Sequence, residues 1–320
     1  MSLSAIVRRT VVAGSALAFL GGVVGTSVAA AASPTYYAFG GSGYGSTASL
    51  GTLVKSGPTS VVAVCSLKDV TKTNSAAATN LGALGNVGAV QSTTTGTSPS
   101  STTRISTTTT STASVSLLSG IIQGSAITSK AVAEHSSAGY TLTGSSTLTG
   151  LKIAGIPISV SPAKNTKISL PANLGTVILN HQTSGTNKYG THQVAVDALY
   201  ITVNSGNLLG LPAGRVVVGH AGASLHDPVH ARPTGSAYVS KIQVAGGLVS
   251  SGPTAISSLP CAGSNSVTVS NTTAQVSVPG VATIGAAGSS AASTDTDTAT
   301  TVHTSANVAN VSLLGGIIQA

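Results

Sequence analysis

Histidine and aspartate side chains gather late in the sequence, at spacings that could hold a metal ion. The candidates are His220, His226, Asp227 and His230. A hairpin could bring His181 and His192 near them, and imidazoles with a carboxylate can bind zinc or copper in an oxidising compartment. Their spacing matches no standard metal signature, and residues 219–233 have the composition of an exposed linker. We therefore interpret them as solvated loop side chains, keep a metal site as the alternative, and expect no cofactor.

Other chemistry-bearing groups are sparse. The carboxylates are Asp69, Glu134, Asp197, Asp227, Asp295 and Asp297. Asp197 lies within an expected strand, which favours a structural hydrogen-bonded group over a catalytic acid. No G-x-S-x-G elbow occurs, and residues 41–45 fail the dinucleotide fingerprint because Ser46 occupies the third glycine position, so they are interpreted as a turn. Because no nucleophile, base and orienting group can be assembled, we expect no enzyme activity.

The chain has two cysteines, Cys65 and Cys261, at equivalent places in an internal repeat described below. In an exported protein they could form one disulfide, which would close a long loop. Two buried or intermolecular thiols are the alternative. We favour the disulfide.

An internal repeat organises the elements that must position these residues. Residues 115–123 (VSLLSGIIQ) return as 311–319 (VSLLGGIIQ), and residues 56–59 (SGPT) return as 251–254. This register predicts three units: unit A at residues 33–135, unit B at 136–234, and a second, incomplete copy of unit A at 235–320. After the repeated block, the first copy continues into a probable strand that the second copy lacks. Either the second copy is truncated or another segment supplies that strand.

Strand patterns dominate these units. Residues 193–203 alternate, which predicts Val194, Val196, Ala198 and Tyr200 on one face, and residues 176–179 can pair with them through a turn at 183–190. The Ser/Thr-rich tract at residues 92–113 is compositionally a linker, but it precedes the repeated block as residues 289–309 do, so we expect solvated Thr-rich strands. The predicted class is all-β, with β-sandwich-like or elongated sheet domains and an internal repeat, or alternatively a β-solenoid.

The N-terminus predicts export. Arg8 and Arg9 precede an apolar stretch that ends in small residues, which indicates a signal peptide at residues 1–32 and a mature chain starting near Ser33. A membrane anchor is the alternative reading of that stretch, and the general secretory and twin-arginine routes both stay open. We expect no membrane association after cleavage.

The charge pattern argues against nucleic-acid binding. The formal net charge of +8 comes from scattered Lys and Arg residues, and charged residues make up only 6% of the chain. Counterion release needs clustered cations, and single-strand binding adds aromatic platforms, whereas aromatics are 3% here. We expect no nucleic-acid partner.

Two sequence blocks resemble the choice-of-anchor P family of secreted actinobacterial surface proteins. One block is residues 306–316, echoed at 112–120, and the other runs through unit B from residue 146 to residue 203. The resemblance covers most of the mature chain and rests on strand and turn patterns. It implies export and attachment to the cell surface by variable anchors, with no activity to carry over. This chain shows no such anchor.

Together these patterns predict a secreted structural or adhesive cell-surface protein without catalytic activity. The alternative is an extracellular carbohydrate- or ligand-binding module, although sugar platforms usually use exposed aromatic rings. The expected location is extracellular, with association to the cell wall as a further expectation. Cell-wall polymer and a second copy of the chain are the partners to consider.

Overall fold

The computed structural model describes residues 35–243, 250–273, 276–278, 282–296, 299–313 and 317–319. The predicted signal peptide at residues 1–32 lies outside them. In these ranges the regular elements are antiparallel β-strands and one short 3₁₀ turn, η1 (Gly82–Leu84). The predicted all-β class is therefore confirmed. Nowhere in the described part does a helix reach the length and apolarity of a membrane span.

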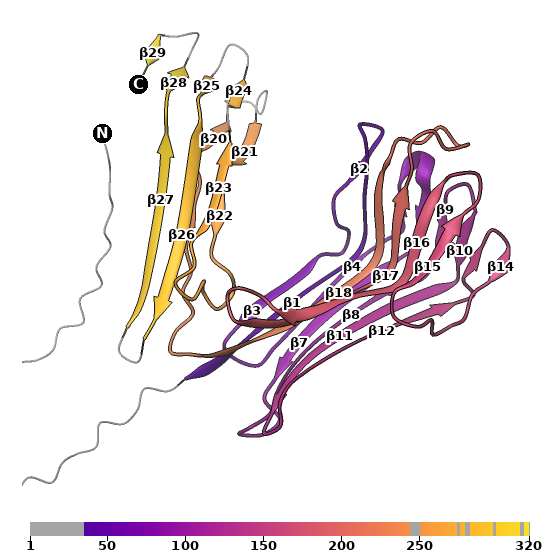
Figure 1. Ribbon diagram of the computed structural model, residues 1–320, viewed down its shortest axis with the longest axis horizontal. Helices are drawn as coiled ribbons and strands as arrows, with labels where there is room; N and C mark the ends of the chain where they lie inside the picture. Colours follow the sequence, from indigo (N-terminus) through magenta and orange to yellow (C-terminus); the bar gives the residue numbers. More distant parts are fainter. Residues whose placement is uncertain are drawn as a thin grey trace, which may run out of the picture.

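A first module holds three sheets (Figure 1). The outer sheet has the order β15-β16-β17-β18-β1-β2, with β3 also on β1. Its strands are β1 (Tyr36–Leu50), β2 (Val54–Ser56), β3 (Val62–Ser66), β15 (Thr166–Leu170), β16 (Gly175–Thr186), β17 (Thr191–Val203) and β18 (Gly214–Val229). The second sheet, β12-β11-β8-β7-β4, contains β4 (Val70–Ala76), β7 (Val90–Thr97), β8 (Arg104–Thr112), β11 (Ala126–Ser136) and β12 (Gly139–Thr149).

The third sheet, β14-β13-β10-β9-β6-β5, contains β5 (Thr79–Asn80), β6 (Gly85–Val87), β9 (Val115–Leu117), β10 (Ile122–Gly124), β13 (Lys152–Ile153) and β14 (Ile156–Pro157). Units A and B share these sheets, because β1 of unit A pairs with β18 of unit B along most of its length. The boundary predicted after residue 135 falls within the β11–β12 hairpin. The two units thus fold as one sandwich.

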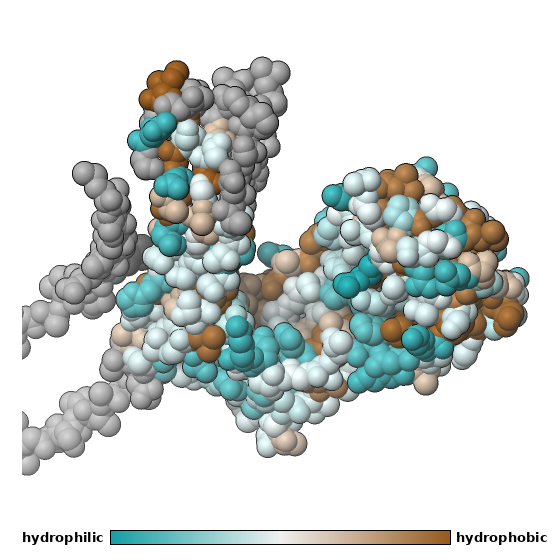
Figure 2. Space-filling model, turned by 45° about the horizontal axis from the view of Figure 1, so that its top comes forward, coloured by the Kyte–Doolittle hydropathy of each residue, from teal (hydrophilic) through white to brown (hydrophobic). Residues whose placement is uncertain are grey.

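A second module stands at the end of the first where β3 lies (Figure 1), and the space-filling view shows it rising from that end (Figure 2). Two of its sheets are small pairs: β19 (Ser236–Ala237) with β22 (Ser257–Ser258), and β20 (Ser240–Gln243) with β21 (Ser250–Thr254). A three-stranded sheet contains β23 (Val269–Thr273), β26 (Ala287–Asp295) and β27 (Thr300–Val308) in that order. A four-stranded sheet contains β24 (Val276–Val278), β25 (Ala282–Ile284), β28 (Val311–Leu313) and β29 (Ile318–Gln319).

The internal repeat is visible in the topology of the two modules. The sheet β23-β26-β27 has the order of β4-β7-β8, and β24-β25-β28-β29 has the order of β5-β6-β9-β10. Chain order and antiparallel pairing are the same in both copies. The repeated sequence therefore folds into a repeated pair of sheets.

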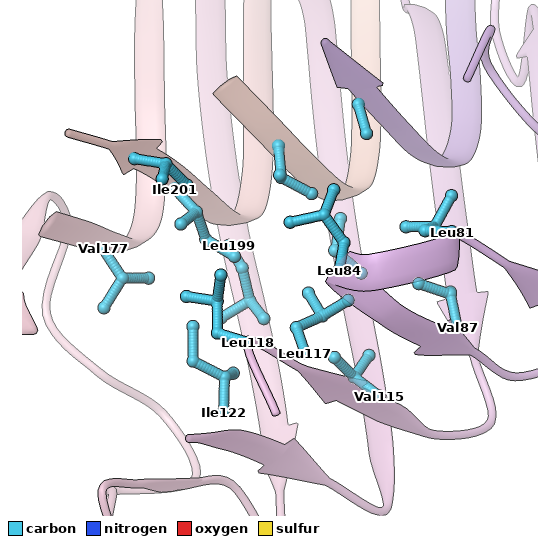
Figure 3. Close-up of a cluster of buried hydrophobic side chains, with 14 of the residues drawn as sticks. Leu81, Leu84, Val87, Val115, Leu117, Leu118, Ile122, Val177, Leu199 and Ile201 are labelled. Carbon is cyan, nitrogen blue, oxygen red and sulfur yellow. The ribbon is translucent and has the colours of Figure 1, made fainter. Parts of the chain in front are cut away.

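One half of the first module has an apolar core. Leucine, isoleucine and valine side chains from η1, β6, β9 and β10 meet those of β16 and β17 (Figure 3). Leu84, Leu117 and Leu199 are fully or almost fully buried there. Packing of branched aliphatic side chains between two sheet faces supplies the main apolar burial of this fold.

The other half combines a smaller apolar cluster, which includes Phe39 and Val196, with buried hydroxyl groups and glycine. Thr94 and Thr108 of the second sheet are fully buried, and their hydroxyl groups hydrogen-bond each other at 2.8 Å. They face Gly41 and Gly43 of β1, which leave room for the sheets to approach closely. The tract at residues 92–113 does form strands, but the expectation of solvated strands was wrong for one face of each, which is buried, while the other face is partly or fully exposed.

The outer sheet bends at the level of Ala198 in strand β17. Up to this bend the inward residues of β17 are Val194, Val196 and Ala198, and beyond it they are Leu199 and the alternate residues that follow. The change of parity follows from left-handed backbone in the neighbouring strands, at Asn180 (φ 49°) and Gly219 (φ 67°). Tyr200 therefore shares the outer face with Asp197, contrary to the simple alternation predicted.

Candidate functional site: a polar trough on the outer sheet

The four predicted metal candidates point to separate partners. His226 bonds through its two ring nitrogens to the carbonyl oxygens of Tyr189 and Asp227, at 2.8 and 2.9 Å. The Asp227 carboxylate accepts a hydrogen bond from the hydroxyl of Tyr140 at 2.7 Å. Among the described residues, no group of three or more His, Cys, Asp or Glu could hold a metal ion. The candidates therefore do not form a common site.

His230 joins the two modules. Its Nδ1 lies 3.1 Å from Oδ2 of Asp295 on β26, and its backbone N–H donates to the same oxygen at 2.9 Å. Desolvation favours the neutral acid, but hydrogen bonds from Thr300 and His230 outweigh it and hold the pKa of Asp295 below its usual range. This contact is structural.

His220 lies in the middle of β18, and because this strand runs to Val229, the interpretation of residues 219–233 as an exposed linker was wrong for residues 219–229. Its Nδ1 hydrogen-bonds Oδ1 of Asp197 at 2.7 Å, while Nδ1 of His181 lies 3.0 Å from Oδ2. The register aligns these three residues across β18, β17 and β16. One partly buried carboxylate thus orients two imidazoles on the outer sheet face.

Ser42 adds a hydroxyl group beside His220. Its Oγ lies 3.4 Å from Nε2 of His220. Residues 41–45 lie within β1, so the turn predicted there was wrong. With Nδ1–H donating to Asp197, Nε2 is left to accept a proton from Ser42, which is the order found in Ser–His–Asp relays.

The ring of Tyr44 covers His220 on the same face. The two rings stack with centroids 4.4 Å apart and planes inclined by 14°. Burial, together with the negative charge of Asp197, raises the pKa of Tyr44 to about 12, against a smaller lowering by Arg215. The phenol is therefore a neutral hydroxyl group at ordinary pH.

A hollow of about 510 Å³, which we call the polar trough, lies beside these residues. Its floor is made by small residues such as Gly222 and Ala195, and its polar groups include Ser42, Thr183 and Gln193. Cys261 of the second module lines the trough as well. No charged side chain contributes to the lining, so the trough suits a neutral ligand rich in hydroxyl groups.

A disulfide fixes the second module at the trough. Cys65 and Cys261 are bonded to each other, with Cα atoms 5.3 Å apart. Cys65 lies on β3 and pairs with Gly40 of β1, directly beside the trough. Arg232 adds a hydrogen bond from its guanidinium to the carbonyl oxygen of Cys65 at 2.8 Å.

Acyl transfer by a Ser42–His220–Asp197 row would have a second requirement. Such enzymes direct two backbone or side-chain donors at the developing oxyanion. β1 is hydrogen-bonded on one side to β18 and on the other to β3 around Ser42, so its ladder amides are already engaged. β1 therefore offers no free backbone amide beside Ser42 for an oxyanion hole.

Sequence reasoning missed Ser42, Tyr44 and the trough itself. The sequence separation of Ser42 and His220 is 178, and only the pairing of β1 with β18 brings them together. The high glycine content of both strands is the one signal in the sequence, because glycine within strands often marks a close approach of another group. The chain matches no protein-family model, no curated protein and no solved structure.

Proposed function

We propose that the chain is a secreted structural or adhesive protein of the cell surface that acts without catalysis. The polar trough carries the proposal, since a neutral, hydroxyl-lined hollow fits contact with a polymer better than turnover of a substrate. The engaged amides of β1 beside Ser42 support the absence of catalysis. The resemblance to choice-of-anchor P proteins supports a surface location.

The disulfide supports extracellular action. Disulfides persist in oxidising compartments and are rare in the cytosol. Export can be tested by the intact mass of the protein from the culture medium and from the wall fraction of expressing cells. We expect a chain starting near Ser33, lighter by two hydrogen atoms before reduction than after. A chain that keeps residues 1–32 and sediments with membranes would contradict secretion.

Adhesion can be tested on the trough directly. Ala195→Leu places a larger side chain on the trough floor, and we expect it to reduce binding to isolated wall polymer about tenfold or more. Thr202→Leu, on the same strand and outer face but beyond the bend, is the matched control and should bind as the original protein does. Equal binding by all three proteins would contradict a role for the trough.

A carbohydrate- or ligand-binding module is the second candidate, and the trough favours it too. The two functions differ in ligand size. A binding module should bind short soluble glycans from a panel, whereas an adhesive protein should bind only the extended polymer. Sugar sites usually stack the ring on an exposed aromatic face, and among the residues of the trough none is aromatic. This observation supports the adhesive function over the binding module.

A further inference from the structure

The edge of β27 differs from the edge of the equivalent strand in the first module. There β8 lies between β7 and β11, and it pairs with β11 along its whole length, from Arg104–His135 to Thr112–Ile127. β27 pairs with β26 on one side. Within the described part of the chain, no strand pairs with its other side. The same fold element is covered in one copy and open in the other (Figure 1).

The backbone hydrogen bonds show which groups this edge presents. The N–H of Ala309 donates to the carbonyl of Ala286, directly opposite in the register of β26 and β27. Because hydrogen-bonded and non-hydrogen-bonded pairs alternate in an antiparallel ladder, alternate residues of β27 direct N–H and C=O away from β26. These residues are Thr300, Val302, Thr304, Ala306 and Val308. In β8 the equivalent residues are the ones whose groups face β11.

β27 also lacks the devices that usually protect an edge strand. It is nine residues long and contains no Lys, Arg, Asp, Glu or Pro. Its register with β26 runs without a bulge. Open edges of this kind are templates for pairing with another strand.

We propose that β27 is an assembly site at which two copies of this chain pair edge to edge. An uncharged strand needs no complementary charge on its partner, so the β27 strand of a second copy is a suitable partner. Antiparallel pairing about a twofold axis makes the contact self-complementary. The register that pairs all nine residues places Thr304 opposite Thr304 of the other copy, and Val302 opposite Ala306.

This register gives hydrogen-bond partners to the open backbone groups of both strands. In this register the residues whose N–H and C=O groups face outward lie opposite one another, so each of these alternate pairs can exchange hydrogen bonds. The two three-stranded sheets then become one six-stranded sheet, as β11 and β12 extend β8, β7 and β4 in the first module. The proposal does not depend on polymer binding at the trough, which lies on the first module's outer sheet.

Sedimentation velocity over a wide concentration range tests the proposal on the full mature chain. We expect a monomer–dimer equilibrium. Thr304→Pro removes an outward N–H without removing a hydrogen bond to β26, and should raise the dimer dissociation constant about tenfold or more. Thr304→Ser keeps the N–H and is the matched control. Far-UV circular dichroism and the intact disulfide of the variants verify their fold.

Cysteine crosslinking tests the register. Directly opposed residues of a hydrogen-bonded antiparallel pair have Cα atoms about 5.5 Å apart, which a disulfide can span, so Thr304→Cys should form a disulfide-linked dimer on mild oxidation. Thr272→Cys, exposed on β23 at the opposite edge of the same sheet, is the control and should form no disulfide-linked dimer. A protein that is monomeric at every concentration, a dimer unaffected by Thr304→Pro, or equal crosslinking at both positions would overturn the proposal.

Discussion

The Nδ1 atom of His220 lies 2.7 Å from a carboxylate oxygen of Asp197, and the other oxygen of that carboxylate holds His181. The three side chains come from three adjacent strands of the outer sheet. Asp197 thus ties β16, β17 and β18 together at the bend. Its side chain is only 14% exposed, which makes its hydrogen bonds costly to lose.

Asp197→Asn should therefore lower the free energy of unfolding by roughly 1–3 kcal/mol, because two hydrogen bonds to a charged group are weakened. Urea unfolding followed by far-UV circular dichroism measures the change. Asp227→Asn is the control, since that carboxylate is 58% exposed and should cost less. Equal losses in the two variants would show that Asp197 has no special structural role.

Tyr44 should make stability fall at alkaline pH. Its pKa rises from the usual 10 to about 12 in the folded protein, so the unfolded chain loses this proton first. The stabilisation is complete below pH 10 and is lost as the pH rises toward 12. Between these values the unfolding free energy should fall more steeply for the original protein than for Tyr44→Phe. Parallel curves would contradict the raised pKa.

Gly43→Ala should destabilise the first module by roughly 1–3 kcal/mol through overpacking. The added Cβ would lie 2.9 Å from Oγ1 of Thr110 and 3.1 Å from Cγ2 of Thr108. Gly57→Ala is the control, because a Cβ at that position meets no atom within 4 Å. Thermal unfolding of both variants decides the question, and an unchanged melting temperature for Gly43→Ala would contradict close packing of the two sheets.

Removing the disulfide should make the two modules unfold at different temperatures. The double variant Cys65→Ala/Cys261→Ala should lose roughly 2–5 kcal/mol of stability, because the bond closes a loop with a sequence separation of 196. Calorimetry should then show the second module unfolding at a lower temperature than the first. Free thiols in the denatured, unreduced original protein would contradict the bond itself.

Periodicity in the sequence was enough to predict the strands but not the faces they bury. The alternation at Val194 and Val196 correctly indicates an inward face of β17. The change of parity after Ala198 depends on left-handed backbone at Asn180 and Gly219, in neighbouring strands, which apolar periodicity does not reveal. Local patterns therefore predict the elements, whereas their pairing decides the burial.

The trough could not be predicted for a related reason. Glycine is typical of turns, so residues 41–45 were interpreted as one. In the structure Gly41 and Gly43 lie in a strand, and Thr94, Thr108 and Thr110 of another sheet occupy the space that a Cβ would need. Nothing local to either segment indicates the other. The position of Ser42 beside His220 follows from that long-range packing.

The disulfide between Cys65 and Cys261 also sets the route by which the protein would carry mechanical load. Tension applied between the two ends of the chain would pass through β1 and β3 to Cys65 and cross directly to Cys261 in the second module. The covalent bond would shield the intervening chain, which includes β17 and β18, from that tension. The first module's sandwich would therefore keep most of its strands while the molecule is under force, and β1 and β3, which line one side of the trough, would carry the load.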